Sequence, residues 1–337
     1  MNLFKLRRTK MLDDAVLDHK PQSILTLLLI FYLVYFIGEV VSAVILLIPS
    51  SIWMLTYDGF IEAVREYTKS AMAGNKDTAI LTNLINEMSA NMPKWLNLIS
   101  IISVVGLGAA AIFYCKKFEK RPISSLGIRK NGAIKETVLG LIIGDTLISL
   151  TVLLAILTGS VSLKVNEAFN LMIALFFVSF LISAFAEVVV FYGYFTTSIA
   201  RDYKISVAIT VGAVLFSLLH SATGEVNYLL LINTILFGVL LGVYVFKRGN
   251  ILGVTGILCA WNFGGACVFG APMGGTTLLP SLYTLVLNEQ KSLANGGNAG
   301  LEGGLCTTVI LLLALSLVFL LKTKKGEESL SDATDFE

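Results

Sequence analysis

Charged residues are scarce in this sequence. Asp, Glu, Lys and Arg make up 14% of the 337 residues, against roughly a quarter in ordinary soluble domains. Hydrophobic residues make up 55%, and the mean hydropathy is +0.80. This composition is typical of an integral membrane protein, and we expect a multi-pass protein of the cell membrane. The net charge of only +2 gives no basic surface for nucleic acid, so no nucleic-acid partner is expected.

Histidine and cysteine, the usual zinc ligands, are also scarce. The chain has two histidines, His19 and His220, and four cysteines without C-x-x-C spacing, all in or beside apolar stretches: Cys115, Cys259, Cys267 and Cys306. A two-histidine zinc site, a thiolate zinc site and a disulfide framework therefore have little support. We expect neither a catalytic metal nor another cofactor.

Long apolar stretches recur along the chain. Stretches of spanning length, about 17 to 25 residues, lie near 23–48, 96–115, 134–157, 172–198, 205–225, 227–246, 250–270 and 305–321. Because lipid offers no partners to backbone N–H and C=O groups, these stretches predict helices. The fold expected is an all-α polytopic membrane protein of about eight transmembrane helices. The first stretch is too long for a signal-peptide core and lacks a small-residue cleavage site, so it is expected to remain as an anchor.

The basic residues predict the orientation. Of the 25 Lys and Arg residues, 19 fall in connections on one side of the predicted spans and 6 on the other. Cytoplasmic connections carry the excess of Lys and Arg. Both termini are therefore expected in the cytoplasm.

Composition also divides the chain. We expect a cytoplasmic leader at 1–22, two membrane helices at 23–115 with an extracytoplasmic amphipathic segment at 50–94, and a catalytic-type core at 116–275. A Gly-rich loop and the last membrane helix follow at 276–321, with the stretch NGGNAGLEGG at 295–304 as a flexible turn. A polar tail at 322–337 is expected to be cytoplasmic and disordered.

A few polar side chains interrupt the apolar stretches. Glu39, Asp145, Glu187 and Asn262 fall near the middle of predicted spans, and His220 lies one to two turns farther out. Taken singly, each has a structural explanation, as a protonated acid bonded within the bundle, an amide joining two helices, or a satisfied histidine. Membrane acids also form proton or cation paths, so a proton-coupled transporter is one hypothesis. Against it, the sequence shows no internal repeat.

Four stretches place these residues in an ordered series. They are EKRPISSLGIRK at 119–130, AFAEVVVFYGY at 184–194, LFSLLHSATG at 215–224 and GILCAWNFGGACVFGAPMGG at 256–275. This series resembles the CPBP family of intramembrane proteases, which includes CAAX prenyl endopeptidase 2 and lysostaphin-resistance-like proteins. The resemblance covers 119–275 and is most specific at 183–270.

The match to the three family motifs is partial. Glu187 begins the E-E-x-x-x-R-G motif, Phe216 and His220 complete F-x-x-x-H, and Asn262 ends H-x-x-x-N. Three motif positions depart from the pattern: the second Glu is Val188, the Arg is Tyr192 and the His of the third motif is Leu258. Because Glu and Arg are lost together, no orphan charge remains, and Tyr192 is expected to hydrogen-bond at the membrane interface.

The resemblance implies a glutamate-dependent endopeptidase. Glu187 would be the general base, His220 its partner and Asn262 the remaining oxyanion donor, acting on a membrane-embedded or prenyl-like peptide or protein. These three residues are expected to face one cavity together with Leu258. Leu258 supplies no donor, which predicts weak activity. The alternative is an inactive family member, a pseudoenzyme that binds and scaffolds or protects a membrane protein partner.

Overall fold

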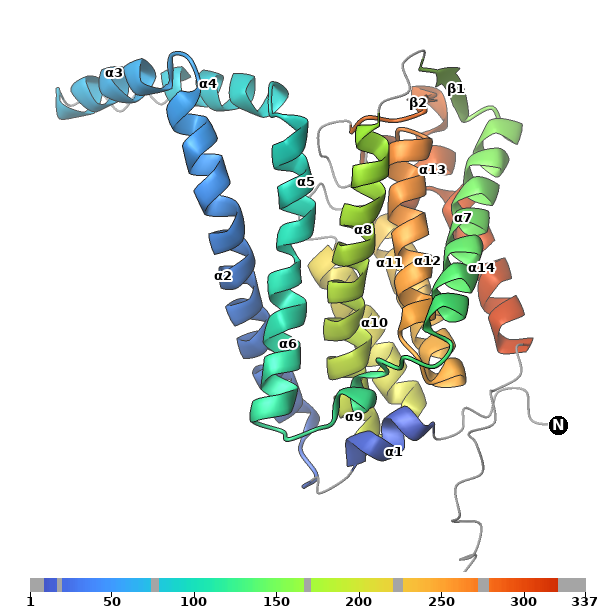
Figure 1. The fold of residues 1–337 in the computed structure, drawn as a ribbon. Helices are drawn as coiled ribbons and strands as arrows, with labels where there is room; N and C mark the ends of the chain where they lie inside the picture. The colour runs from blue at the N-terminus through green and yellow to red at the C-terminus, as the bar shows by residue number, and fades with distance from the viewer. Residues whose placement is uncertain are drawn as a thin grey trace, which may run out of the picture.

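The computed structural model describes residues 9–16, 20–73, 79–166, 171–220, 227–271 and 279–320. Most of these residues lie in helices that run up and down a single bundle (Figure 1). The prediction of an all-α polytopic membrane protein is confirmed. The tail at 322–337, His19 and parts of the leader lie outside the described residues.

Within the residues that the structure describes, five helical segments are long and apolar enough to cross a membrane. They are α2 (Ile24–Thr56), α5 with α6 (Lys94–Ser103, Val105–Lys117), α7 (Ala133–Leu157), α8 with η2 and α9 (Met172–Val188, Val189–Thr196, Thr197–Asp202) and α11 (Tyr228–Arg248). Shorter apolar helices are α10 (Ile205–His220), α12 with the π-helical η3 (Leu252–Phe263, Gly264–Val268) and α14 (Leu305–Leu320). These segments correspond to the predicted spans, but the count of about eight crossings and the cytoplasmic termini stay predictions.

Local sequence sets several helix ends. Ser23 caps α2, its hydroxyl accepting a hydrogen bond from the Thr26 backbone N–H at 3.1 Å. Asn227 caps α11 in the same way through its side-chain oxygen. That helix ends at Gly249, whose φ of 62° is the left-handed conformation that favours glycine. The first predicted membrane helix, α2, continues to Thr56, beyond residue 48 at which the apolar stretch was expected to end.

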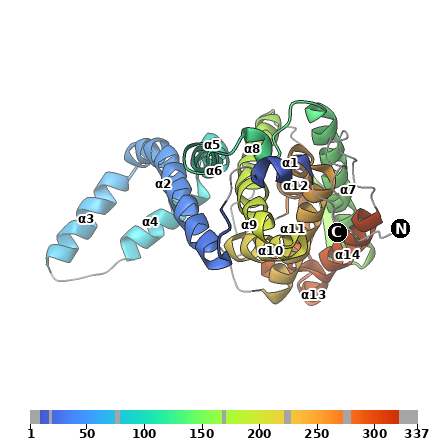
Figure 2. The same ribbon diagram turned by 90° about the horizontal axis from the view of Figure 1, so that it is seen from below.

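The two ends of the bundle differ. The short helices α1 (Lys10–Val16) and η1 (Ile123–Leu126) lie at the lower end in Figure 1, where α14 also ends. At the opposite end, α3 (Phe60–Met72) and α4 (Ala79–Ala90) fall within the segment expected to be amphipathic and extend sideways from α2. Figure 2 shows α2, α3 and α4 projecting from one side of the other helices.

The upper end also carries an element that the sequence did not predict. Strands β1 (Val161–Val165) and β2 (Tyr283–Leu287) form an antiparallel pair in which Val161 faces Leu287 and Val165 faces Tyr283. The two segments are far apart in sequence, so no local hairpin pattern reveals their pairing. Within the described residues, this pair satisfies backbone groups that lie outside the helices.

The Gly-rich loop at 295–304 differs from the expected flexible turn. It follows η4 (Glu289–Lys291) and α13 (Ser292–Asn295) and contains the turns η5 (Gly297–Ala299) and η6 (Leu301–Gly303). Asn295 is fully buried, and its amide donates to the backbone oxygens of Ser160 at 2.7 Å and Asn288 at 3.0 Å. These bonds fix the loop against the start of β1.

Glycines bring α7 and α12 into backbone contact. A Cβ atom on Gly140 would collide with the backbone of Gly253, and one on Gly256 would collide with the backbone of Thr137. Small residues permit such close helix approach in membranes. The contact fixes the position of α12, the helix that carries Leu258 and Asn262.

Candidate active site

Glu187 lies in the last turn of α8 and is partly buried. Its Oε1 atom accepts a hydrogen bond from the Ser183 hydroxyl, one turn earlier, at 3.0 Å. Glu187 also interacts electrostatically with His220 on α10. Within the described residues no hydrogen bond engages Oε2, so this oxygen is available to a ligand or water.

A π-helical segment begins two residues after Glu187. The hydroxyls of Thr196, the last residue of η2, and Thr197, the first of α9, each donate to the η2 carbonyl oxygen five residues earlier, at 2.7 Å. Tyr192, in this segment, is 2% exposed, and its hydroxyl donates to the Gly238 carbonyl oxygen of α11 at 3.1 Å. The expectation that Tyr192 bonds at the membrane interface is therefore wrong, because the side chain points into the bundle. A second π-helical segment, η3, follows Asn262, and such segments frequently accompany functional sites.

Arg121 forms hydrogen bonds to the same π-helical segment and to the residues that follow it. This residue is 5% exposed and donates hydrogen bonds to the Gly193 carbonyl oxygen at 3.4 Å and to the Ser198 hydroxyl at 3.0 Å. Glu119 pairs with Arg121 at 3.0 Å and with Arg201 at 2.8 Å. The sequence predicts Arg121 only as one of the cytoplasmic basic residues. Its position in EKRPISSLG, within the family resemblance, is the one signal of a structural role.

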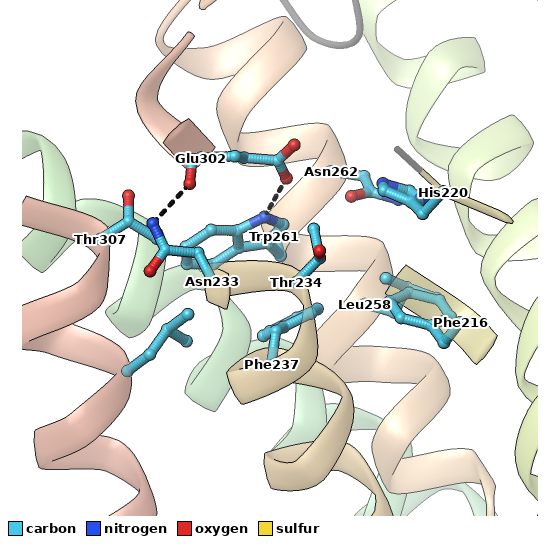
Figure 3. Close-up of a pocket in the computed structure, with 11 residues that line it drawn as sticks. Phe216, His220, Asn233, Thr234, Phe237, Leu258, Trp261, Asn262, Glu302 and Thr307 are labelled. Carbon is cyan, nitrogen blue, oxygen red and sulfur yellow. Dashed lines mark hydrogen bonds between the residues drawn. The ribbon is translucent and has the colours of Figure 1, made fainter. Parts of the chain in front are cut away.

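His220, Leu258 and Asn262 line one pocket (Figure 3). His220 is the last residue of α10, and its ring stacks on Phe216 with centroids 5.2 Å apart and planes at 19°. Leu258 and Asn262 lie one turn apart on α12 and reach the pocket from the same helix face. Glu187 is not among the lining residues, so the expected arrangement of all four around a single cavity is only partly seen.

The pocket also contains a carboxylate that sequence reasoning missed. Glu302, from the Gly-rich loop, accepts a hydrogen bond from the Trp261 indole N–H at 2.7 Å (Figure 3). The amide of Asn233 holds the loop by donating to the backbone oxygens of Glu302 at 2.7 Å and Gly304 at 3.0 Å. The only sequence signal was an acidic residue within a Gly-rich stretch, which reads equally well as an exposed turn.

The pocket is narrow. The empty volume of the pocket, including the open space at its mouth, is about 300 Å³. Its enclosed interior can hold only about one water molecule. Phe216, Phe237, Trp261, Leu258 and Leu311 form its apolar walls. Within the part of the chain that the structure describes, the side chains of His220 and Asn262 make no hydrogen bond, which leaves their polar atoms for an occupant.

The other membrane acids lie elsewhere. Glu39 on α2 and Asp145 on α7 are exposed on the outside of the helix bundle, and neither lines the pocket. Tyr35, also on α2, nevertheless interacts electrostatically with both Glu39 and Glu187. The described residues also contain no group of three or more His, Cys, Asp or Glu side chains that could hold a metal ion.

Comparison with protein-family models places this site within a known family. Residues 169–264, which include Glu187, His220 and Asn262, match the model described as type II CAAX prenyl endopeptidase Rce1-like. Searches of curated proteins and of solved structures gave no match. The family resemblance is confirmed, and the protein is a multi-pass membrane protein. Over residues 169–264, about a quarter of its length, the chain is therefore similar to the CAAX protease family.

Proposed function

We propose that the protein is a CAAX-type intramembrane endopeptidase that uses Glu187 to hydrolyse a membrane-associated peptide or protein. One observation carries the proposal: Glu187 interacts with His220, and the pocket beyond His220 also contains Asn262. These are the three matched polar residues of the motifs, contributed by α8, α10 and α12. No metal or other cofactor enters the proposed reaction.

In this reaction Glu187 and His220 hold the attacking water between them. The Ser183 hydroxyl occupies Oε1 of Glu187, which turns the free Oε2 into the acceptor for the water proton. As the proton moves to Glu187, the water oxygen forms a bond to the scissile carbonyl carbon. The Asn262 amide donates to the oxyanion, and the C–N bond then breaks as the leaving nitrogen takes up the proton.

The test is cleavage by purified protein in lipid vesicles, with a panel of prenylated and hydrophobic peptides read by mass spectrometry. Glu187→Gln keeps the shape of the side chain but removes the base, so cleavage should be lost. Asp145→Asn is the matched control, because it makes the same chemical change in an exposed residue of another membrane helix. Cleavage that persists unchanged in Glu187→Gln would refute the mechanism.

A second function is favoured by the departure at position 258. Leu258 is 1% exposed and offers no hydrogen-bond donor where the family motif has His. An inactive member would keep the pocket and use it to bind and scaffold or protect a membrane partner. In that case no wild-type cleavage would be detected, and Glu187→Gln would leave partner capture from membranes intact.

A further inference from the structure

The carboxylate of Glu302 is the feature of the pocket that the proposed catalytic set does not use. It reaches the pocket from η6, on a loop far from the three family motifs. We infer that the pocket binds a primary ammonium group, with Glu302 as its counter-ion.

The charge of the pocket points to a cation. Glu302 is the acidic residue among the lining side chains, and those side chains include no Lys or Arg. The salt bridges recorded within the described residues do not include Glu302. Its Oε1 accepts a hydrogen bond from Trp261, whereas no hydrogen bond in the described ranges engages its Oε2.

The size of the pocket selects the kind of cation. The interior has room for about one water molecule, and an ammonium group is a compact charge with three donors. A guanidinium is planar and larger, and a quaternary ammonium is larger still and has no N–H donor. The space therefore fits the tip of a Lys side chain or a free chain N-terminus.

The walls of the pocket suit the same group. Phe237 and Trp261 lie with ring centroids 5.0 Å apart, and both face the pocket (Figure 3). Aromatic faces attract ammonium groups, and they do so more strongly where water is excluded. Asn262 contributes a side-chain oxygen that can accept one N–H, and Glu302 Oε2 can accept another.

The acid is also held in place before a ligand arrives. Asn233 donates to the backbone oxygens on both sides of Gly303 and itself accepts from the Thr308 hydroxyl at 2.7 Å. The Trp261 indole then fixes the carboxylate. A charge fixed in advance loses little freedom on binding, which favours affinity for a small ligand.

Ammonium binding stands on the pocket alone, while its use as a substrate subsite rests on the proposed function. Because His220 and Asn262 line the same pocket, an ammonium group seated there lies beside the proposed reaction centre. The preferred peptide would then carry a Lys side chain or a free N-terminus close to the bond that is cut.

Trp261 fluorescence measures binding without requiring cleavage. In the Trp53→Phe/Trp95→Phe protein, Trp261 is the sole remaining tryptophan, and its indole contacts Glu302. We expect a saturable change with n-butylammonium, and affinity weaker by about tenfold or more for 1-butanol, methylguanidinium and tetramethylammonium, since hydrogen bonds to charged groups are strong. Equal binding of 1-butanol or tetramethylammonium would overturn the inference.

Variants assign the binding to the carboxylate. Glu302→Gln should weaken n-butylammonium binding by about tenfold or more, whereas Glu289→Gln, an exposed glutamate of the same loop region, should leave it unchanged. Unchanged binding in Glu302→Gln, with the far-ultraviolet circular dichroism of the folded protein retained, would refute the assignment.

Peptides identify the source of the ammonium group. An N-acetylated hydrophobic peptide with one Lys is compared with its norleucine analogue and with a non-acetylated peptide that lacks Lys. Competition by the first identifies a Lys side chain, competition by the third identifies a chain N-terminus, and competition by none of them refutes the subsite. If wild type cleaves no peptide while n-butylammonium still binds, the proposed function fails and the ammonium site stands. If wild type does cleave, the KM for the preferred peptide should rise in Glu302→Gln while kcat is retained.

Discussion

The departure at Leu258 allows a gain of activity to be predicted. Leu258 lies one turn before Asn262, faces the same pocket and occupies the position at which the family motif has His. Leu258→His would place a second donor beside Asn262. Because one oxyanion donor contributes about 2.7–4 kcal/mol to transition-state stabilisation, the substitution should raise kcat by about a hundred- to a thousandfold.

The structure supports the full size of this effect, because the pocket donors other than His220 and Asn262, which already have roles in the proposed reaction, are used in holding the fold. The Asn233 amide and the Trp261 indole bond to the Glu302 loop. The hydroxyls of Thr234 and Thr307 donate to backbone oxygens of Leu230 and Leu301. Among the described residues that line the pocket, none of these donors is available to replace the missing His.

The assay compares cleavage rates of wild type, Leu258→His and Leu258→Met in lipid vesicles. Methionine keeps the apolar volume of leucine without adding a donor, so it controls for changes in packing. Burying the imidazole should cost about 1–3 kcal/mol of stability, which thermal unfolding of each variant measures. A folded Leu258→His that cleaves no faster than Leu258→Met would refute the reasoning.

The remaining predictions concern the fold. Lys69→Cys in α3 should react with a membrane-impermeant thiol reagent from outside the cell, whereas Lys130→Cys should react only after permeabilisation. Background labelling should be low because the native cysteines are buried, and the reverse labelling pattern would show that the predicted orientation is wrong. Tyr192→Phe should lower the unfolding free energy by about 0.5–1.5 kcal/mol by removing the bond to Gly238, and an unchanged melting temperature would contradict this. Arg121→Met should cost more, about 1.5–3 kcal/mol, because it removes hydrogen bonds of a buried charged group to Glu119 and Ser198, while Glu119 keeps its pair with Arg201; a melting-temperature loss no larger than that of Tyr192→Phe would count against it.

Sequence reasoning succeeded where the information is local. Apolar length predicted the membrane helices, and the four-residue spacing of Leu258 and Asn262 predicted that both face the same way on α12. The match to the family motifs also predicted that His220 faces the same pocket. These relations depend on the period of one helix or on a pattern of neighbouring residues.

Prediction from the sequence failed where a contact joins segments that are far apart in the chain. Glu302 and Trp261 are 41 residues apart, and Arg121 and Gly193 are 72 apart. Sequence spacing does not indicate either contact, so the sequence predicts Glu302 as part of a flexible turn and Arg121 only as a cytoplasmic charge, although Arg121 and Gly193 both lie within the family resemblance. The strand pair β1–β2 was missed for the same reason. Their partners become visible only once the helices are packed.

The departures from the family motifs therefore carry different weight. At Tyr192 the motif has a cation, and the structure brings another one, Arg121, to the carbonyl oxygen of the next residue, Gly193, while the tyrosine hydroxyl bonds to α11. The π-helical segment after Glu187 thus keeps both a buried cation and a polar anchor, although neither has the motif's geometry. At Leu258 no described neighbour supplies the lost donor, because the pocket donors other than His220 and Asn262 are engaged in holding the Glu302 loop and the helices. Loss of the motif arginine is therefore weak evidence against catalysis, whereas loss of the histidine at position 258 is the change that should determine the rate.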